Sequence, residues 1–171
     1  MKILICFLMM LCSTPIINKT IAQENKSTEP KTYIKVPVGY LMVLREGDDI
    51  LAKIEELAVK EKIPSANFTG MGFVDIKFGF FNFDTKEYDP KEFKAVELAS
   101  MTGSIAWQKG KVSLHTHGVI TKKDFTAHGG HVLAATVSTG SLEILVTVHD
   151  KKLERVVEQP LGANVLNLGD K

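Results

Sequence analysis

The chain has 171 residues, of which 21 are basic, 20 acidic, 44% hydrophobic and 8% aromatic. This composition excludes a disordered, collagen-like or membrane-embedded chain and indicates one globular domain. The formal net charge is +1, and only Arg45 and Arg155 among the basic residues are arginine. Sequence-specific DNA recognition depends on a cationic excess and on arginine, so the composition argues against it.

The first 22 residues have the pattern of a signal peptide. Lys2 is followed by ten apolar residues, 3–12, and then by the small-residue pattern Thr20-Ile21-Ala22. We expect cleavage after Ala22. Ten apolar residues are far fewer than the ~20 that span a bilayer, so no stable membrane anchor is expected. A buried N-terminal strand and a lipoprotein modified at Cys12 are the weaker alternatives.

Export would place the mature chain in the periplasm or outside the cell. Removing residues 1–22 takes away Lys2 and Lys19 and no acidic residue, which leaves 19 basic against 20 acidic residues. Both cysteines, Cys6 and Cys12, also leave with the peptide. The mature chain therefore has neither a disulfide framework nor a cysteine nucleophile.

The region before Pro64 is predicted to contain one strand and one helix. Residues 23–35 are mostly polar and are predicted to form a flexible N-terminal segment, and strand-like sequence begins near Tyr33 and runs to Leu44. Apolar residues then recur at helical spacing over residues 50–58, with Asp48 or Asp49 as the N-cap. This amphipathic helix should stop before Pro64.

After Pro64 the apolar residues follow the period of β-structure. Short runs are separated by glycines or polar turns such as Gly70-Met71-Gly72, Asp84-Thr85-Lys86 and Lys109-Gly110-Lys111. We therefore predict an α+β fold, a single domain over residues 36–155 with a mainly antiparallel (mixed) sheet of about seven strands, followed by a C-terminal segment, 156–171. The predicted strands after Pro64 are 66–69, 74–83, 93–99, 104–107, 112–120, 131–138 and 142–149.

Several common catalytic motifs are excluded by spacing. Gly70-Met71-Gly72 lacks a third glycine and precedes a strand, so no dinucleotide cofactor is expected there. Neither Ser104 nor Ser141 lies in a Gly-x-Ser-x-Gly motif. The sequence names no catalytic residue, and whether the chain is an enzyme stays open.

Histidines carry the clearest chemical signal. Four of the five lie within residues 115–131. On a strand, His115 and His117 would point to the same side, about 6 to 7 Å apart, and a hairpin would bring His131 opposite or nearly opposite His117. Three imidazoles with one open coordination position are typical of a zinc site that can bind a ligand. We predict His115, His117 and His131 as the metal ligands.

The other polar candidates have plainer alternatives. A His-x-His pair on a strand is often a surface or core pair without a metal. His128 is out of strand phase with His131, and we expect an exposed loop residue, with a fourth or outer ligand as the alternative. His149 is interpreted as structural. Glu97 is the acid considered as a base or as a support for a ligand, with a structural role as the stronger interpretation.

Taken in order, several motifs resemble those of the PPC domain family, the plant and prokaryote conserved domain. The resemblance covers roughly residues 38–150, nearly all of the mature domain. It rests on Glu46-Gly47-Asp48-Asp49-Ile50, Thr69-Gly70-Met71-Gly72, Phe78-Gly79-Phe80-Phe81, Thr85-Lys86-Glu87-Tyr88, the stretch from Glu97 to Ile105, His115-Thr116-His117 and Gly129-Gly130-His131.

The resemblance implies a compact α/β domain that assembles as a homotrimer. Bacterial members carry a His-x-His and Gly-Gly-His set that coordinates zinc or a similar divalent ion, which maps onto His115, His117 and His131. They often bear a DNA-binding label by analogy with plant members, whose separate Arg-Gly-Arg-Pro motif this chain lacks. Residues 132–135 also depart from the family pattern, which has a glycine-containing step after Gly-Gly-His.

Two classes of function therefore remain. The first is an exported homotrimer that binds a divalent metal, most readily zinc, and a small-molecule ligand; it includes a metal-dependent enzyme in which the open position activates water or polarises a substrate. Nickel, copper and iron also suit nitrogen donors. The second is a DNA-binding module, although nucleic acid is not the expected partner of the mature chain. It would need a basic face built from lysines such as Lys122, Lys123, Lys151 and Lys152.

Overall fold

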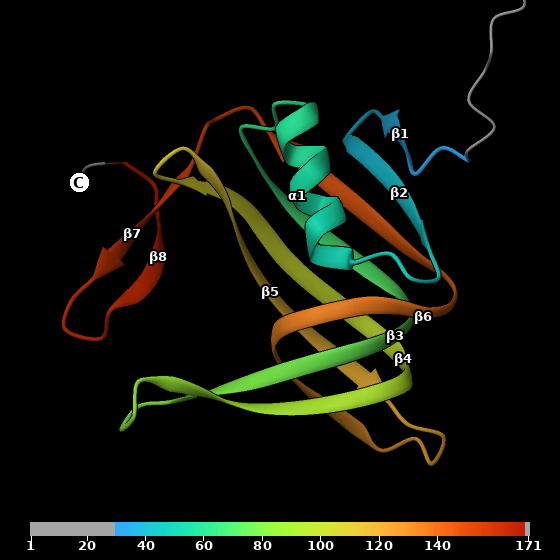
Figure 1. Ribbon diagram of the computed structural model, residues 1–171. Coiled ribbons are helices and arrows are strands. Elements are labelled where there is room, and N and C mark those ends of the chain that lie inside the picture. The colour runs from blue at the N-terminus through green and yellow to red at the C-terminus, as the bar shows by residue number, and fades with distance from the viewer. Residues whose placement is uncertain (1–29, 170–171) are drawn as a thin grey trace, which may run out of the picture. The chain divides into compact units, whose positions relative to one another are not determined.

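Strands with alternating buried and exposed side chains make up most of the protein. The computed structural model describes residues 30–169, and the predicted signal peptide, 1–22, lies outside the described residues. Eight strands and one helix follow one another along the chain (Figure 1). They are β1 (Tyr33–Val36), β2 (Gly39–Arg45), α1 (Ile50–Lys60), β3 (Ser65–Asn82), β4 (Glu87–Gln108), β5 (Lys111–Thr121), β6 (Ala127–His149), β7 (Glu154–Glu158) and β8 (Ala163–Asn167).

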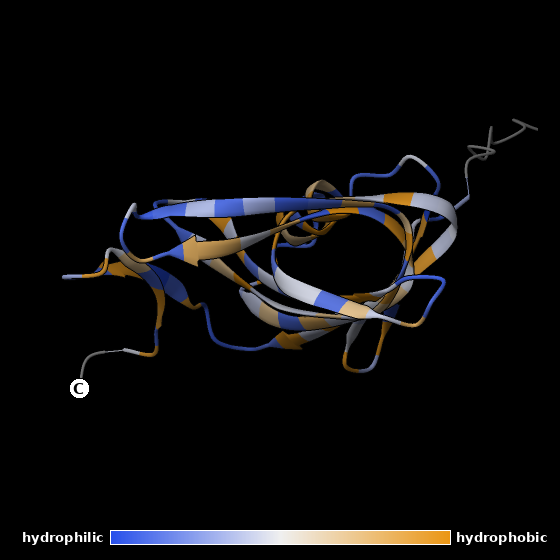
Figure 2. Ribbon diagram, turned by 90° about the horizontal axis from the view of Figure 1, so that it is seen from below, coloured by the Kyte–Doolittle hydropathy of each residue, from blue (hydrophilic) through white to orange (hydrophobic). Residues whose placement is uncertain are grey.

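All eight strands belong to one sheet that closes on itself. The order is β1-β2-β6-β3-β4-β7-β8, and β5 pairs with both β4 and β6. Because β3 also pairs with both β4 and β6, these four strands form a ring, which is visible from below in Figure 2. Every pairing is antiparallel except the short contact of β4 with β7 at Trp107 and Glu154. A closed ring leaves fewer free strand edges and holds its registers firmly.

Helix α1 has the position and the caps that the sequence predicts. The Asp49 carboxylate accepts a hydrogen bond from the backbone N–H of Ala52 at 2.9 Å, which fixes the first turn. The buried face of the helix joins the same core as the inward side chains of β2, β3 and β6. Within residues 30–169 we find no helix that is both long enough and apolar enough to cross a membrane.

The predicted fold class needs a correction, because the protein is mainly β. Predicted strands 66–69 and 74–83 are one strand, β3, and predicted strands 93–99 and 104–107 are both parts of β4. The predicted turn at Gly70-Met71-Gly72 is a bulge inside β3. A Cβ on Gly72 would lie 2.6 Å from the carbonyl oxygen of Ser141. Glycine is needed there because β6 approaches closely, and the chain does not reverse its direction at this point.

The C-terminal segment contains two strands that the sequence analysis did not assign. Residues 156–171 were given as a C-terminal segment without elements, and β7 and β8 form an antiparallel hairpin that begins at Glu154. The backbone N–H of Trp107 donates to the carbonyl oxygen of Leu153, which ties this hairpin to β4. Each of these strands has only five residues, which is too short for a clear alternation of apolar and polar side chains. Their pairing with the sheet also depends on β4, whose partner residue Trp107 is more than forty residues earlier.

We predict that Gly103→Ala destabilises the ring. Gly103 lies between Phe68 of β3 and Thr116 of β5, and an added Cβ would collide with the Phe68 ring and lie 2.7 Å from the carbonyl oxygen of His115. Overpacking of this kind costs about 1–3 kcal/mol, which urea denaturation followed by circular dichroism would detect. Gly130→Ala is the matched control, since its nearest neighbour would be 3.4 Å away. Equal losses in the two variants would contradict this account.

Candidate metal centre

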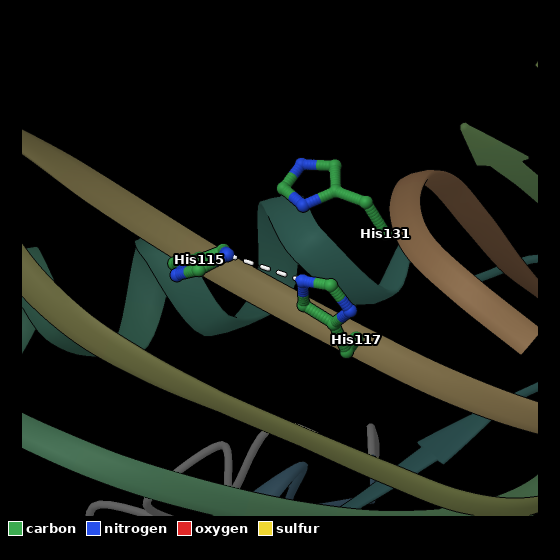
Figure 3. A group of neighbouring side chains, drawn as sticks. All are labelled: His115, His117 and His131. Atoms are coloured by element: carbon green, nitrogen blue, oxygen red, sulfur yellow. Dashed lines mark hydrogen bonds between the residues drawn. The ribbon is translucent and has the colours of Figure 1, made fainter. Parts of the chain in front are cut away.

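The three predicted histidines lie on one face of two neighbouring strands. His115 and His117 come from β5, and His131 comes from β6 directly opposite His117. Residues two apart on a strand share a face, as do residues paired across strands. Thr116 and Gly118 alternate with the histidines and are buried, so the histidine face is the outer face of the ring. Figure 3 shows the three imidazole rings side by side.

The distances between the rings fit a single metal ion. The three centroid separations are 5.1, 5.2 and 5.3 Å, and one nitrogen from each ring lies within 4.8 Å of the others. Zinc binds imidazole nitrogen at about 2.0–2.1 Å in a tetrahedral arrangement, which puts two ligand nitrogens about 3.4 Å apart. The Nε2 atoms of His115 and His117 are 3.2 Å apart (Figure 3). A His131 nitrogen lies within 4.8 Å of a nitrogen of both other rings, so all three rings can face one ion.

Burial and mutual repulsion keep two of these rings uncharged. Burial, followed by the neighbouring His115 and His117, lowers the pKa of His131 to about 4. Burial also lowers the pKa of His115, with further contributions from His117 and Arg155. Neutral imidazole is the form that binds a metal, because protonation occupies the lone pair. At neutral pH these two side chains are therefore ready to act as ligands.

Tyr88 orients His131 from two strands away. The phenol ring stacks on the imidazole with centroids 4.9 Å apart and planes 15° from parallel. Tyr88 is on β4 and His131 on β6, with Gly79 of β3 between them. A Cβ on Gly79 would lie 2.8 Å from the Tyr88 ring, so this glycine gives Tyr88 the room to cross β3. No local pattern in the sequence indicates this contact, because three strands must pair before it exists.

A second residue that sequence reasoning missed is Arg155. Its side chain is buried, and Nη2 donates a hydrogen bond to Ser104 Oγ at 2.7 Å. Ser104 is paired with His115 across β4 and β5, which places the guanidinium next to the histidines. Arg155 is one of only two arginines, but nothing in its local sequence distinguishes it from a surface residue of an exposed strand.

The other polar candidates lie away from the three histidines. The His128 ring packs against Phe93, with centroids 4.9 Å apart. Glu97 pairs with Thr121, four residues beyond His117 along β5, which corresponds to about 13 Å. His149 Nδ1 lies 3.3 Å from Ser65 Oγ, eighteen residues from His131 along β6. These positions leave three imidazoles as the cluster.

The four lysines considered for a basic face are divided between the two ends of β5. Lys122 and Lys123 follow its last residue. Lys152 lies over the ring of Trp107, which pairs with Val112 at the other end of the strand. An 11-residue strand is about 35 Å long, so the two pairs do not form one patch. Lys152 also pairs with Glu154 at 3.1 Å, which partly neutralises that end.

Comparison with known proteins agrees with the resemblance noted in the sequence. A family model described as the Plants and Prokaryotes Conserved (PCC) domain matches residues 35–150. A solved structure from Ralstonia eutropha JMP134, described as a "putative DNA-binding protein", is 52% identical over 81% of this chain and 96% of its own, with a TM-score of 0.79. No curated protein matches this chain.

Two archaeal structures share the fold at lower identity. A plant- and prokaryote-conserved (PPC) protein from Pyrococcus horikoshii is 27% identical, covers 77% of this chain and 92% of its own, and has a TM-score of 0.69. A metal-containing protein from Archaeoglobus fulgidus is 26% identical, covers 80% of this chain and 98% of its own, and has a TM-score of 0.67. The fold of residues 31–169 is therefore the fold of this group.

We predict that metal-free protein loses stability as the pH falls from about 6.5 to about 4. In that interval the unfolded chain protonates residue 131, whose ordinary pKa is about 6.5, while folded His131 stays neutral. The free energy of unfolding therefore decreases, and its fall levels off for this residue below pH 4. Urea denaturation at several pH values would show a smaller decrease in His131→Gln. An NMR titration with the His131 midpoint near 6.5 would refute the prediction.

Proposed function

The chain belongs to the Plants and Prokaryotes Conserved domain family, and from this premise we propose that it is an exported, homotrimeric protein that binds one divalent metal ion per chain. The ligands are His115, His117 and His131. The single observation that carries this proposal is the convergence of three imidazole nitrogens on one point of the outer face. Such a convergence has little value for packing, because two of the three side chains are exposed.

Zinc is the ion that the donor set favours. Three imidazoles with nitrogens within 4.8 Å of one another suit zinc, and no carboxylate belongs to the cluster in the described part of the chain. Hard ions such as magnesium and calcium prefer oxygen ligands. The metal-containing relative from Archaeoglobus fulgidus supports the choice of a metal over a simple histidine cluster.

Each residue of the centre has a separate task. His115 and His117 supply two nitrogens from one strand, and His131 supplies the third from the neighbouring strand. Tyr88 restrains the plane of His131 by stacking. With zinc bound to these three ligands, the remaining coordination position would supply Lewis-acid chemistry towards an oxygen or nitrogen of a small ligand. The exposure of His115 and His117 leaves that position open to solvent.

Ligand binding is better supported than catalysis. A hydrolytic reaction at such a centre uses a general base within hydrogen-bonding reach of the reacting atoms. Glu97 was the acid considered for that task, and its place along β5 is about 13 Å from His117. Binding of a metal together with a small ligand is therefore the function we assign.

Export and self-assembly complete the proposal. The pattern of residues 1–22 supports export to the periplasm or the medium. The β3–β4 hairpin projects from the ring in Figure 1 and exposes aromatic side chains, with Phe80 75% and Phe83 59% exposed. An apolar projection of this kind is typical of a surface that a second copy covers. We assign it to the trimer interface.

Nucleic acid is not part of this proposal. The DNA-binding description belongs to the relative from Ralstonia eutropha. In this chain the mature sequence has 19 basic and 20 acidic residues, and the lysines considered for a basic face lie at opposite ends of β5. A protein that neutralises several phosphates needs those charges on one surface.

We predict that the purified protein carries about one zinc per chain and that His115→Ala combined with His117→Ala carries less than a tenth of that amount. Two of three ligands are then missing, and one imidazole does not retain zinc through dialysis. Elemental mass spectrometry measures the metal, and circular dichroism confirms the fold.

His128→Ala is the matched control, because it removes a histidine from the same hairpin without touching the cluster. It should retain the metal of the unmodified chain. If the double variant held as much zinc as the control, the proposed centre would be wrong.

We predict that the protein sediments as a trimer and that Phe80→Glu shifts it to monomer. A charge in place of an exposed phenylalanine disfavours burial of the hairpin at an interface but leaves the core intact. Analytical ultracentrifugation measures the mass. Phe125→Glu is the control, since Phe125 is 88% exposed on the β5–β6 loop. A monomeric wild type would reject the trimer, and a trimeric Phe80→Glu would reject the hairpin as its interface.

A further inference from the structure

Arg155 is a buried cation that has no acidic partner among residues 30–169. Its side chain is only 6% exposed, and its one side-chain hydrogen bond in the described part of the chain goes to the neutral hydroxyl of Ser104. Nε is enclosed and has no acceptor. The ion pairs found among residues 30–169 all involve lysines on the surface, and none includes Arg155.

An unpaired buried guanidinium is an expensive arrangement. Buried charges in proteins are normally paired or bound to an ion, because the loss of hydration is otherwise not compensated. Burial lowers the pKa of Arg155, and no neighbouring carboxylate acts in the other direction. An arginine in this state indicates an anion that residues 30–169 do not supply.

The position of Arg155 connects this anion with the metal centre. Ser104, which accepts its hydrogen bond, is paired with His115, and such pairs have Cβ atoms about 5 Å apart on the same face. His117 and His131 lie on that face too. The guanidinium and the three imidazoles therefore border one patch of the outer surface, with contributions from β4, β5, β6 and β7.

We propose that Arg155 anchors the anionic group of a small oxyanion ligand, a carboxylate or a phosphate, whose second donor reaches the metal ion at His115, His117 and His131. This inference rests on the proposed metal centre and names the class of its ligand. Guanidinium forms paired hydrogen bonds with planar carboxylates and with phosphates, which a lysine does not. Arg155 lies five residues beyond the region matched by the family model, so the family assignment does not include it.

The test measures anion binding by the zinc-loaded protein. Isothermal titration with succinate and with inorganic phosphate, in separate arms, should show binding by the wild type and at least tenfold weaker binding by Arg155→Gln. Arg45→Gln is the matched control, because Arg45 is the other arginine of the chain, is exposed and lies on β2. The arm that binds more tightly distinguishes a carboxylate ligand from a phosphorylated one.

Two further readouts separate anchoring from a structural role. The zinc content of Arg155→Gln should equal that of the wild type, and its unfolding midpoint without anion should be equal or higher, because an uncompensated charge is gone. The proposal is overturned if Arg155→Gln binds both anions as the wild type does, or if the wild type binds neither.

The outcome also distinguishes this inference from the proposed metal function. If the protein failed to bind zinc but still bound an anion through Arg155, the result would support the anchor and reject the metal centre. If the wild type bound zinc but neither anion, the result would support the metal centre and reject the anchor. A lower unfolding midpoint and loss of self-association in Arg155→Gln, without anion binding, would assign Arg155 to the contact between subunits and reject the anchor.

Discussion

The antiparallel pairing of β5 with β6 at His117 and His131 is the contact on which the whole centre depends. A shift of one residue in this register would turn His131 to the inner face, because side chains alternate along a strand. The ring prevents such a shift, since β6 is also paired with β3 at Gly79 and β5 with β4 at Thr102. Four strands from different parts of the sequence therefore fix the relative positions of the imidazoles.

The surroundings of the three rings are suited to binding an ion. Partial burial and mutual repulsion lower the pKa values of His115 and His131, which disfavours the charged rings and leaves their lone pairs available. The stacking of Tyr88 on His131 fixes the ring without a hydrogen bond to either nitrogen. Three like groups brought together repel one another when protonated, and a bound cation would supply the stabilising interaction that the arrangement lacks.

Local patterns in the sequence predicted the helix, the strand character and the three histidines, because each depends on spacing along one or two neighbouring segments. They failed where a residue acts through the sheet as a whole. Gly70 and Gly72 have the composition of a turn, but in β3 they accommodate close strands at a bulge. Tyr88 reaches His131 only because Gly79 is between them, and Arg155 reaches Ser104 only because the C-terminal hairpin folds back on β4. Contacts of this kind leave no period or motif in the sequence.

The distribution of charge is the basis on which we propose a small anion, and not a nucleic acid, as the partner of this chain. A nucleic acid is a line of phosphates and is bound by cations spread along a surface. In this chain the lysines at the two ends of β5 are about 35 Å apart, and Lys152 is paired with Glu154. A divalent ion at the three histidines, beside Arg155 and with no carboxylate in the cluster among residues 30–169, would concentrate positive charge at one point instead. A compact positive centre of that kind would suit a ligand with one or two anionic groups better than a line of phosphates.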